Sequence, residues 1–322
     1  MVYGITVGDS SGIGPEVLLK AWKAGELRHP VVAYGDLSAL EFYNDRLGLG
    51  VPLQSVARVS DRREGKLNVF DAGILQHADV TPGRLNGKSG SAAREYVVSA
   101  ARAALSRQIA AMVTLPMNKE ATQLSDPAFV GHTELIGQVC GSSDVTIMLV
   151  SDQLIVTHVS THVSLMTAIA RAKKERICTI LRLTCDAVRR LRDNPRIAVA
   201  GLNPHAGENG LFGSEEATDI IPAIEWAQNQ GMPVEGPFPP DTVFFMAVRK
   251  KRFDAIVCMY HDQGHIPLKL LDFESGVNVA LGLPIVRTSV DHGTAFDIAG
   301  RGLASTRSLV SALELAVKLA GD

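Results

Sequence analysis

The sequence predicts an α/β protein built on mostly parallel β-sheets. Short β-branched runs alternate with longer helical patterns along the whole chain, which is typical of this fold class. The chain has 322 residues, enough for two domains, and 46% of them are hydrophobic. We therefore expect a large buried core divided between two α/β domains.

In the first half of the chain, apolar β-branched runs precede stretches in which apolar residues recur at helical spacing. The expected strands are 2–7, 30–35 and 110–115. The expected helices are 14–25, 36–48 and 92–108. The stretch 66–86 is rich in Gly, Asp and Pro, which indicates an excursion between elements.

The same alternation continues in the second half. The expected strands are 145–150, 154–159, 196–202 and 253–260, and the expected helices are 165–191, 215–230 and 305–321. We expect the last helix to return to the first domain. This gives a discontinuous first domain of residues 1–128 and 290–322, and a second domain of residues 129–289.

The composition excludes several classes of partner. The formal net charge is −2, from 32 basic and 34 acidic residues without a basic run, so we expect neither a nucleic-acid partner nor a membrane partner. The four cysteines form no CxxC motif, and the chain has no pattern typical of a signal peptide or a membrane span. A cytoplasmic protein is the expectation.

Three histidines follow three predicted strands of the second half: His162, His205 and His261. In open α/β sheets ligands gather beyond the carboxyl ends of strands. Three imidazoles with an open position suit a catalytic divalent ion, for which Zn, Co or Mn fit better than Mg. The alternative is that each is a separate core or loop histidine.

Four other side chains in the second half are weaker candidates for a functional role, or have a structural role as an alternative. His158 is expected to point into the sheet and to be structural. We rank His265 below the three because HDQGH lacks the helical context and the Glu of HExxH. Asp262 suits a hydrogen bond to a metal-bound imidazole. Asp241, after a Pro-rich turn, is either a helix N-cap or a functional carboxylate.

Glycine loops and isolated charges indicate sites for anions. The segment GDSSGIGPE, from Gly8 to Glu16, is either an anion cradle at a helix start or a tight turn between a strand and a helix. Lys269 and Arg287 lie in apolar contexts, where an unpaired charge is costly. Lys119, His132 and Thr133 also lie at expected loops or element ends, where they could clamp a phosphate or a carboxylate.

Several segments together resemble one family, the 4-hydroxythreonine-4-phosphate dehydrogenases of pyridoxal phosphate synthesis. The matching segments are GDSSGIGPE, TLPMNK, GHTE, STHVSL, LNPHAGENGLFGSEE, GPFPPDT, MYHDQGHIPLK and GVNVALGLPIVRTSVDHGTAFDIAGRG. The resemblance implies a two-domain fold like that of isocitrate and isopropylmalate dehydrogenases, with an interdomain cleft. It also implies a homodimer whose active site is shared between subunits.

The resemblance assigns roles to individual residues. The implied metal ligands are His162, His205 and His261. The implied substrate-binding residues are His132, Thr133, Lys269, Asn278 and Arg287. DHGTAFDIAGRG is similar to the cofactor-binding stretch of isopropylmalate and isocitrate dehydrogenases, which implies NAD binding by His292, Gly293, Thr294, Ala295 and Asp297.

Departures from the family pattern bear on the substrate. Ser10 and Ser11 stand where the vitamin enzyme has Pro and Ala, His265 is added, and residues 209–213 replace GGHMG. These features are similar to the branch that oxidises D-threonate or D-erythronate 4-phosphate.

The expected reaction is a metal-dependent, NAD-linked oxidation and decarboxylation of a 4-phosphorylated four-carbon hydroxy acid, with Lys269 or Asp241 handling the proton. The sequence leaves open whether NAD or NADP is used. The alternatives are a dehydrogenase of a cis-dihydrodiol carboxylate, a phosphate acyltransferase and a non-catalytic metal-binding protein.

Overall fold

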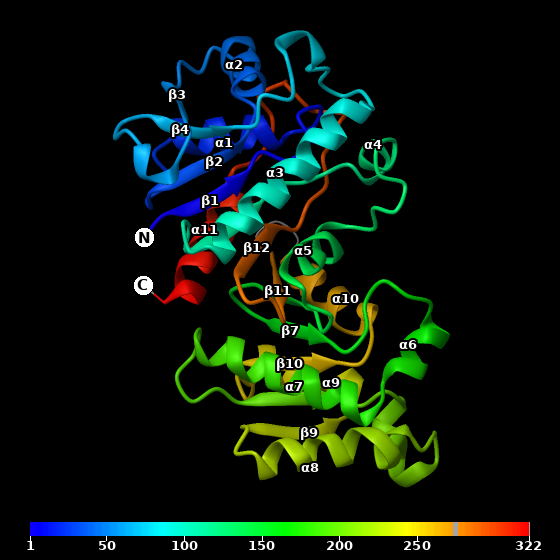
Figure 1. The fold of residues 1–322 in the computed structure, drawn as a ribbon. Coiled ribbons are helices and arrows are strands. Elements are labelled where there is room, and N and C mark those ends of the chain that lie inside the picture. The colour runs from blue at the N-terminus through cyan, green and yellow to red at the C-terminus, as the bar shows by residue number, and fades with distance from the viewer. Residues whose placement is uncertain (273–275, 322) are drawn as a thin grey trace. The chain divides into compact units, whose positions relative to one another are not determined.

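The chain forms two compact units in the computed structural model, which describes residues 1–272 and 276–321. Unit 1 consists of Met1–Ser143 and Leu283–Asp322, and unit 2 is Asp144–Gly282. Figure 1 shows the helices and strands of each unit. Because the last 40 residues of the chain belong to unit 1, that unit is discontinuous in sequence.

Unit 1 contains a sheet with the strand order β3-β4-β2-β1-β5-β12. Every neighbouring pair in it is parallel, which requires crossover connections such as helices. Its strands are β1 (Tyr3–Thr6), β2 (Val31–Gly35), β3 (Leu53–Val56), β4 (Leu67–Asp71), β5 (Ala111–Thr114) and β12 (Val286–Val290). Its helices are α1 (Gly14–Lys23), α2 (Leu37–Arg46), α3 (Gly87–Leu105), α4 (Lys119–Gln123), α5 (His132–Cys140) and α11 (Arg307–Ala320).

Unit 2 contains a mixed sheet with the order β11-β6-β7-β10-β8-β9. Strands β7, β10, β8 and β9 are parallel, whereas β6 pairs antiparallel with both β7 and β11. The strands are β6 (Thr146–Val150), β7 (Ile155–His158), β8 (Ile197–Ala200), β9 (Val234–Phe238), β10 (Ala255–Cys258) and β11 (Val277–Leu281). The helices are α6 (Leu165–Arg171), α7 (Lys174–Arg189), α8 (Ile221–Asn229), α9 (Pro240–Val248) and α10 (His261–Leu271).

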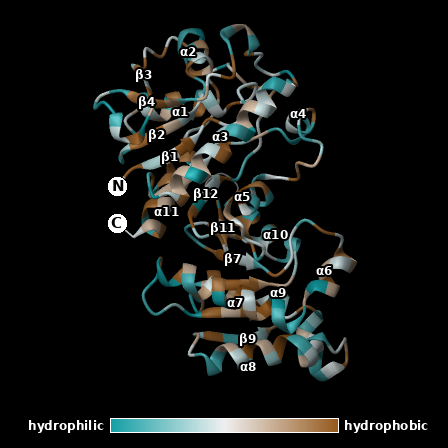
Figure 2. Ribbon diagram, viewed as in Figure 1, coloured by the Kyte–Doolittle hydropathy of each residue, from teal (hydrophilic) through white to brown (hydrophobic). Residues whose placement is uncertain are grey.

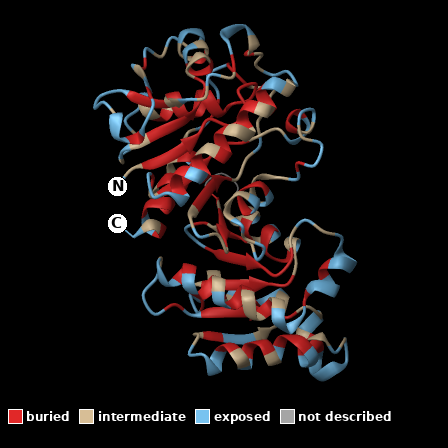
Figure 3. Cartoon of the chain, viewed as in Figure 1, coloured by how far each residue is buried: buried red, intermediate tan, exposed pale blue. Residues whose placement is uncertain are grey.

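The prediction of an α/β protein with a mostly parallel sheet is confirmed. The central strands are buried and apolar, as Figure 2 and Figure 3 show. In β7 the alternation of side chains decides which helix each residue meets. The Thr157 hydroxyl lies 2.8 Å from that of Thr184 on α7, whereas His158 contacts α10. This alternation aims His158 at the helix that begins with His261.

Several expected elements differ from the observed ones. The helix expected at 165–191 is two helices, because Asp219 interrupts it: its carboxylate pairs with Lys173 and accepts a hydrogen bond from the backbone N–H of Lys174. The helix expected at 215–230 starts with a π-helical turn, Glu216–Ile220, before α8. The excursion expected at 66–86 contains β4. The sequence patterns did not predict β3, β9, β11, β12, α4, α5, α9 or α10.

The bounds of the two units differ from those expected for the domains. Residues 129–143 and 283–289, which we expected in the second domain, lie in unit 1. Helix α5 packs against α3, and β12 pairs with β5, so long-range packing in unit 1 recruits both segments.

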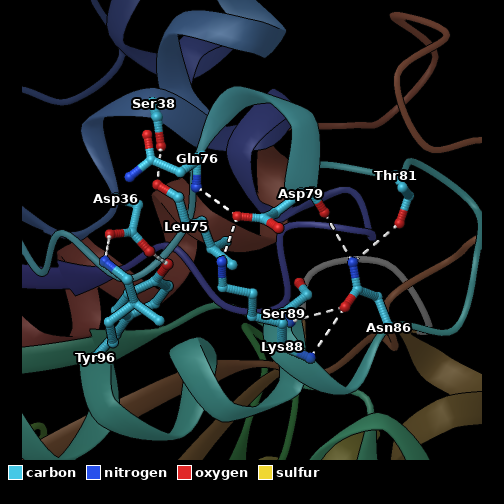
Figure 4. A network of polar contacts seen from close by, with 11 residues as sticks. Asp36, Ser38, Leu75, Gln76, Asp79, Thr81, Asn86, Lys88, Ser89 and Tyr96 are labelled. Carbon is cyan, nitrogen blue, oxygen red and sulfur yellow. Dashed lines mark hydrogen bonds and ion pairs between the residues drawn. The ribbon is translucent and has the colours of Figure 1, made fainter.

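A polar network attaches the segment after β4 to helix α3 (Figure 4). The hydroxyl of Tyr96 on α3 donates a hydrogen bond to Asp36, and Lys88 pairs with Asp79. Asn86 caps α3, because its side chain accepts hydrogen bonds from the N–H groups of Lys88 and Ser89. These contacts order a segment that has little regular structure of its own.

No helix within the described parts of the chain, 1–272 and 276–321, has the length and apolar character needed to cross a membrane.

Candidate active site

The three candidate metal ligands follow three neighbouring parallel strands of unit 2. His162 comes after β7, His261 after β10 and His205 after β8, and the strand order is β7-β10-β8. Because parallel strands end at the same edge of a sheet, all three side chains start from one edge.

His162 and His261 lie beside one pocket. Their ring centroids are 5.6 Å apart. The pocket has a volume of about 520 Å³. Its lining residues are Thr161, His162, Val163, Ser164, Leu165, Ala168, Tyr260, His261 and Asp262. Two imidazoles therefore lie close together in the lining of a pocket large enough for a small ligand.

The carboxylate of Asp262 orients the ring of His261. Nδ1 of His261 lies 2.6 Å from Oδ1 of Asp262. Since a carboxylate only accepts hydrogen bonds, Nδ1 carries the proton, and a neutral ring then has its lone pair on Nε2. This is the arrangement in which an imidazole binds a metal while a carboxylate holds its other nitrogen.

A second pair of histidines lies behind His261. His265 stacks on the His261 ring with centroids 3.6 Å apart and planes 11° apart, and it is 8% exposed. His158 is fully buried, and its Nε2 lies 3.2 Å from Nδ1 of His265. Burial lowers the pKa of His158 to about 3 and that of His265 to about 4, with the neighbouring histidines adding to both shifts. Both rings are neutral at physiological pH.

The view that HDQGH lacks a helical context was wrong. His261 is the first residue of α10, and one turn of helix separates it from His265. Gly264 and Pro267 are unfavourable in helices, so the sequence pattern did not predict α10. For this reason it did not indicate that His261 and His265 share one face of a helix.

His205 lies in an unusual backbone segment. Residues 205–209 all have positive φ, between 42° and 79°, although only Gly207 is a glycine. A left-handed turn of this kind costs roughly 1–2 kcal/mol per non-glycine residue. Strain of this size indicates a segment whose position is imposed by its surroundings.

Two buried side chains hold this segment. The Glu216 carboxylate accepts hydrogen bonds from the N–H groups of Leu202 and Asn203 at 2.8 and 2.7 Å. Gln263, on α10, donates to the Gly201 carbonyl at 2.7 Å and accepts from Met259 N–H at 2.6 Å. Gln263 thus links the strand end before His205 to the strand end before His261. Sequence reasoning missed both residues.

The three histidines do not form a complete metal site within one chain. Among residues 1–272 and 276–321, no three His, Cys, Asp or Glu side chains are grouped so that they could hold an ion. His205 instead packs against Phe212, with ring centroids 6.2 Å apart. The imidazoles of His162 and His261 suit a divalent ion by the chemistry of their donors, and a third donor has to come from elsewhere.

The remaining candidates of unit 2 lie on separate elements. Lys269 is half-buried in the last turn of α10. Asp241 is exposed in the first turn of α9, whose N-cap is Pro239, so the N-cap interpretation was wrong because the helix starts one residue before it. Asn278 lies on β11, and its buried Oδ1 has no hydrogen-bond partner among the described residues. A ligand that donates a hydrogen bond would satisfy it.

In unit 1, Arg287 forms a buried cationic centre. It is 3% exposed, and its guanidinium donates hydrogen bonds to the Thr114 hydroxyl at 3.1 and 2.7 Å. It forms no ion pair with any residue in the described part of the chain. Burial lowers its pKa to about 10, although Glu134 opposes the shift. A buried cation without a carboxylate at contact distance suits an anionic ligand.

His132 and Thr133 start α5 in the same unit. Burial, and then the charge of Arg287, lower the pKa of His132 to about 3, so the ring is neutral. Its Nε2 is buried without a hydrogen-bond partner in the described part of the chain. His132 therefore offers an unused nitrogen within the electrostatic reach of Arg287.

The segment expected to bind the cofactor packs on the loop before α1. The Thr294 carbonyl accepts a hydrogen bond from Ile13 N–H at 3.0 Å, and a Cβ on Gly12 would lie 2.7 Å from that oxygen. The buried carboxylate of Glu16 accepts hydrogen bonds from the N–H groups of Gly300 and Ala304.

The loop itself is a tight turn between a strand and a helix. The N–H groups of Ser11, Gly12 and Ile13 all donate to acceptors within the chain. This favours the turn interpretation over the anion cradle. His292, Gly293, Thr294, Ala295 and Asp297 lie in the segment that this loop supports, and Nε2 of His292 is buried without a partner among the described residues.

Comparison with known proteins identifies the family. Residues 26–316 match the family model described as Pyridoxal phosphate biosynthetic protein PdxA. The chain belongs to this family. The resemblance drawn from the sequence motifs is confirmed.

Individual members of the PdxA family, and one related structure, are similar along their whole length. A D-threonate 4-phosphate dehydrogenase from Salmonella typhimurium is 43% identical, covering 98% of both chains. The crystal structure of a 4-hydroxythreonine-4-phosphate dehydrogenase from Klebsiella pneumoniae is 40% identical, with a TM-score of 0.88 over 99% of both chains. A terephthalate 1,2-cis-dihydrodiol dehydrogenase from Burkholderia xenovorans LB400 is 29% identical, with a TM-score of 0.73 over 99% of this chain and 98% of its own.

Proposed function

We propose that the protein is a metal-dependent, NAD-linked dehydrogenase that oxidises and decarboxylates a 4-phosphorylated four-carbon hydroxy acid. D-Threonate or D-erythronate 4-phosphate is the first choice of substrate, and 4-hydroxythreonine 4-phosphate the second. The observation that carries the proposal is the buried Arg287 guanidinium without an ion-pair partner among the described residues. The names of full-length relatives at 40–43% identity support the reaction class.

The substrate anions need cationic and hydrogen-bonding partners. Arg287, which the Thr114 hydroxyl holds in place, binds an anionic end of the substrate, and His132 and Thr133 contribute from the start of α5. In unit 2, Asn278 and Lys269 bind the remaining polar groups.

His162 and His261 would hold a divalent ion, which would supply positive charge next to the substrate hydroxyl and so favour its loss of a proton. NAD would supply the hydride acceptor for the carbon that bears this hydroxyl. Lys269 accepts the hydroxyl proton, and Asp241 is the second candidate for this role. The resulting β-keto acid loses CO₂, and Lys269 returns a proton to the carbon from which the carboxylate left.

The third metal ligand, His205, comes from a second copy of the chain in a homodimer with shared active sites. Two observations support this proposal. His162 and His205 are both exposed in the single chain. The exposed apolar side chains Leu165 and Met166 follow His162 closely, and Leu211 and Phe212 follow His205.

The cofactor, fold and location complete the proposal. NAD binds to the segment His292–Asp297, which the loop before α1 supports. Because this segment is similar to the cofactor-binding stretch of isocitrate and isopropylmalate dehydrogenases, we also propose their two-domain fold for the chain. The cysteines of the described residues are all free, which supports a cytoplasmic location.

The experiment uses the purified, metal-stripped protein with Zn²⁺, Co²⁺, Mn²⁺ or Mg²⁺ and either NAD⁺ or NADP⁺. The substrates are the three 4-phosphorylated acids and their unphosphorylated forms. We expect NADH and CO₂ to form in equal amounts, only with a metal and only with a phosphorylated acid. The variant His162→Ala should retain the fold and lose turnover, and full activity of the metal-stripped protein would refute the metal assignment.

The second candidate is a dehydrogenase of a cis-dihydrodiol carboxylate, which the structure from Burkholderia xenovorans favours. Its substrate has a carboxylate for Arg287 but no phosphate. Turnover of a dihydrodiol carboxylate, and not of the phosphorylated acids, would replace the first proposal by this one. A phosphate acyltransferase would form no NADH with any of these substrates.

A further inference from the structure

The proposed reaction uses His162, His205 and His261 but leaves two buried histidines of unit 2 without a role. His265 stacks on the His261 ring at 3.6 Å, and His158 is in contact with His265. Neither faces an acidic side chain at hydrogen-bond distance in the described part of the chain. A buried pair of imidazoles so close to a candidate metal ligand calls for a physical explanation.

Hydrogen-bond geometry determines where the protons of this pair lie. Nδ1 of His158 lies 3.4 Å from the Ile147 carbonyl, and Nδ1 of His265 lies 3.0 Å from the His261 carbonyl. Carbonyl oxygens only accept, so each Nδ1 carries a proton. Nε2 of His158, 3.2 Å from Nδ1 of His265, must then accept. The Nδ1–H of His265 is shared between this nitrogen and the His261 carbonyl.

This arrangement restricts His261 from two directions. The Asp262 carboxylate accepts from Nδ1 at 2.6 Å and so holds one edge of the ring. The His265 ring covers one face at an interplanar angle of 11°. Because His158 and the His261 carbonyl hold His265 itself, the covering ring cannot rotate freely. Nε2 of His261 remains available to a ligand.

We propose that His265 is a positioning residue for His261: its ring, held by His158, fixes the plane of the His261 ring, whose tautomer Asp262 fixes, and so presents Nε2 to the pocket. The inference deepens the proposed function, on which it rests for the identity of the bound ion. The proton positions are independent of any metal. If the His261 imidazole is already oriented, it loses less conformational entropy when the ion binds. We therefore expect the affinity for the metal ion to depend on His265.

The chain offers variants that separate the two properties of His265. His265→Leu removes both the ring and the N–H donor. His265→Phe keeps an aromatic face over His261 but removes the donor. Ile266→Val, on the exposed side of the same helix, is the matched control. Thermal unfolding of each variant shows whether it is folded.

The first measurement is long-range ¹H–¹⁵N NMR of the histidine rings in the metal-free protein. We expect His158, His261 and His265 each with a proton on Nδ1. In His265→Leu, the ring signals of His261 should shift and broaden because the ring loses its stacked partner, and His265→Phe should restore most of the wild-type signal. A proton on Nε2 of His265, or an unchanged His261 signal in His265→Leu, would overturn the proposal.

The second measurement is the dissociation constant for Co²⁺, by titration of its absorption spectrum. We expect His265→Leu to bind about 10-fold more weakly, the lower end of the effect typical of residues that orient a metal ligand. His265→Phe should recover part of this loss, and Ile266→Val should bind like the wild type. Equal Co²⁺ affinity of His265→Leu and the wild type would contradict a positioning role.

The two measurements keep the inference separate from the proposed function. If the protein binds Co²⁺ with the expected pattern but forms no NADH, the proposed reaction fails and the positioning role stands. If no Co²⁺ binds, the role in metal affinity is refuted, and the NMR spectra alone decide whether His265 holds the plane of the His261 ring.

Discussion

At the scale of single residues, buried polar side chains form hydrogen bonds with the backbone segments that carry the candidate ligands. Glu216 is the clearest case. It is 4% exposed, it accepts two backbone hydrogen bonds from the segment before His205, and it also accepts one from the Asn203 amide. A buried carboxylate that satisfies backbone N–H groups offsets the strain of the left-handed turn that follows.

The first prediction concerns this carboxylate. In Glu216→Gln the side-chain NH₂ would meet N–H donors, so at least one buried donor loses its acceptor. We expect the free energy of unfolding to fall by about 1–3 kcal/mol. Urea denaturation measures the change. The control is Glu215→Gln, because the half-buried Glu215 carboxylate accepts from the Asn203 side chain but from neither Leu202 nor Asn203 N–H, and this variant should cost less than half as much. Equal losses would contradict a special role for Glu216.

The second prediction concerns pH. Burial holds the pKa of His132 and His158 at about 3 in the folded protein, below the ordinary value of 6.5. As the pH falls, His132 and His158 are therefore protonated in the unfolded chain at a higher pH than in the folded protein. Stability is fully present above pH 6.5 and is lost as the pH falls from 6.5 toward 3.

By pH 5 each of these two histidines should cost about 1–2 kcal/mol of stability relative to pH 7. Urea denaturation at the two pH values measures the loss. His132→Gln should lose less between pH 7 and pH 5 than the wild type. His77→Gln, at an exposed position, is the control and should keep the wild-type dependence. An unchanged dependence in His132→Gln would show that this ring already titrates when folded.

At the scale of elements, α10 follows β10 and packs against β7 and β10. It contains both Gly264 and Pro267, which disfavour helices, and sequence patterns therefore did not predict it. The glycine has a packing role, because a Cβ at this position would lie 2.5 Å from Nε2 of His158 and 2.9 Å from Sγ of Cys258. Close approach of α10 to β7 and β10 requires a residue without a side chain here.

The third prediction tests this close approach. Gly264→Ala should raise the intrinsic helix propensity, yet we expect a loss of about 1–3 kcal/mol because the methyl group overpacks the site. Urea denaturation measures it, and the ¹⁵N signal of His158 should shift. Gly293→Ala is the control, since a Cβ there would meet no atom within 4 Å. A stabilised Gly264→Ala variant would refute the packing argument.

At the scale of the whole molecule, unit 2 has large apolar side chains on its surface, and their exposure to water does not stabilise a monomer. Met166 on α6 is 84% exposed and Leu270 on α10 is 85% exposed, with Phe245 on α9 at 55%. Exposed apolar side chains that are neighbours in the chain, as Leu165 and Met166 are beside His162, suit an interaction surface. They support the proposed homodimer, in which His205 of one chain completes the metal site of the other.

The fourth prediction tests the dimer. A charge at an apolar position beside either histidine should oppose association, so Met166→Glu and Leu211→Glu should sediment with half the mass of the wild type. Leu303→Glu is the control, because Leu303 is 67% exposed in unit 1 and lies outside the proposed interface. Sedimentation velocity of metal-free protein measures the masses. A wild-type protein that sediments as a monomer at micromolar concentration would contradict the shared site.

The sequence by itself determined the fold class, the family and the strand ends from which the candidate histidines start, because strand alternation, helical periodicity and motifs are local patterns. It did not reveal α10, the break between α6 and α7, or the strands β11 and β12. Those depend on long-range contacts such as the Lys173–Asp219 pair, which overrides the continuous helical periodicity of 165–191.

Only the tertiary structure showed how His261 is held. The stacking of His265, the contact with His158 and the support from Gln263 join residues up to 107 positions apart in the chain. Propensities act over a few residues, whereas the free energy of burying an imidazole depends on which partners the fold brings to it. The sequence therefore named the candidate ligands, and packing in unit 2 decided which of them approach one another.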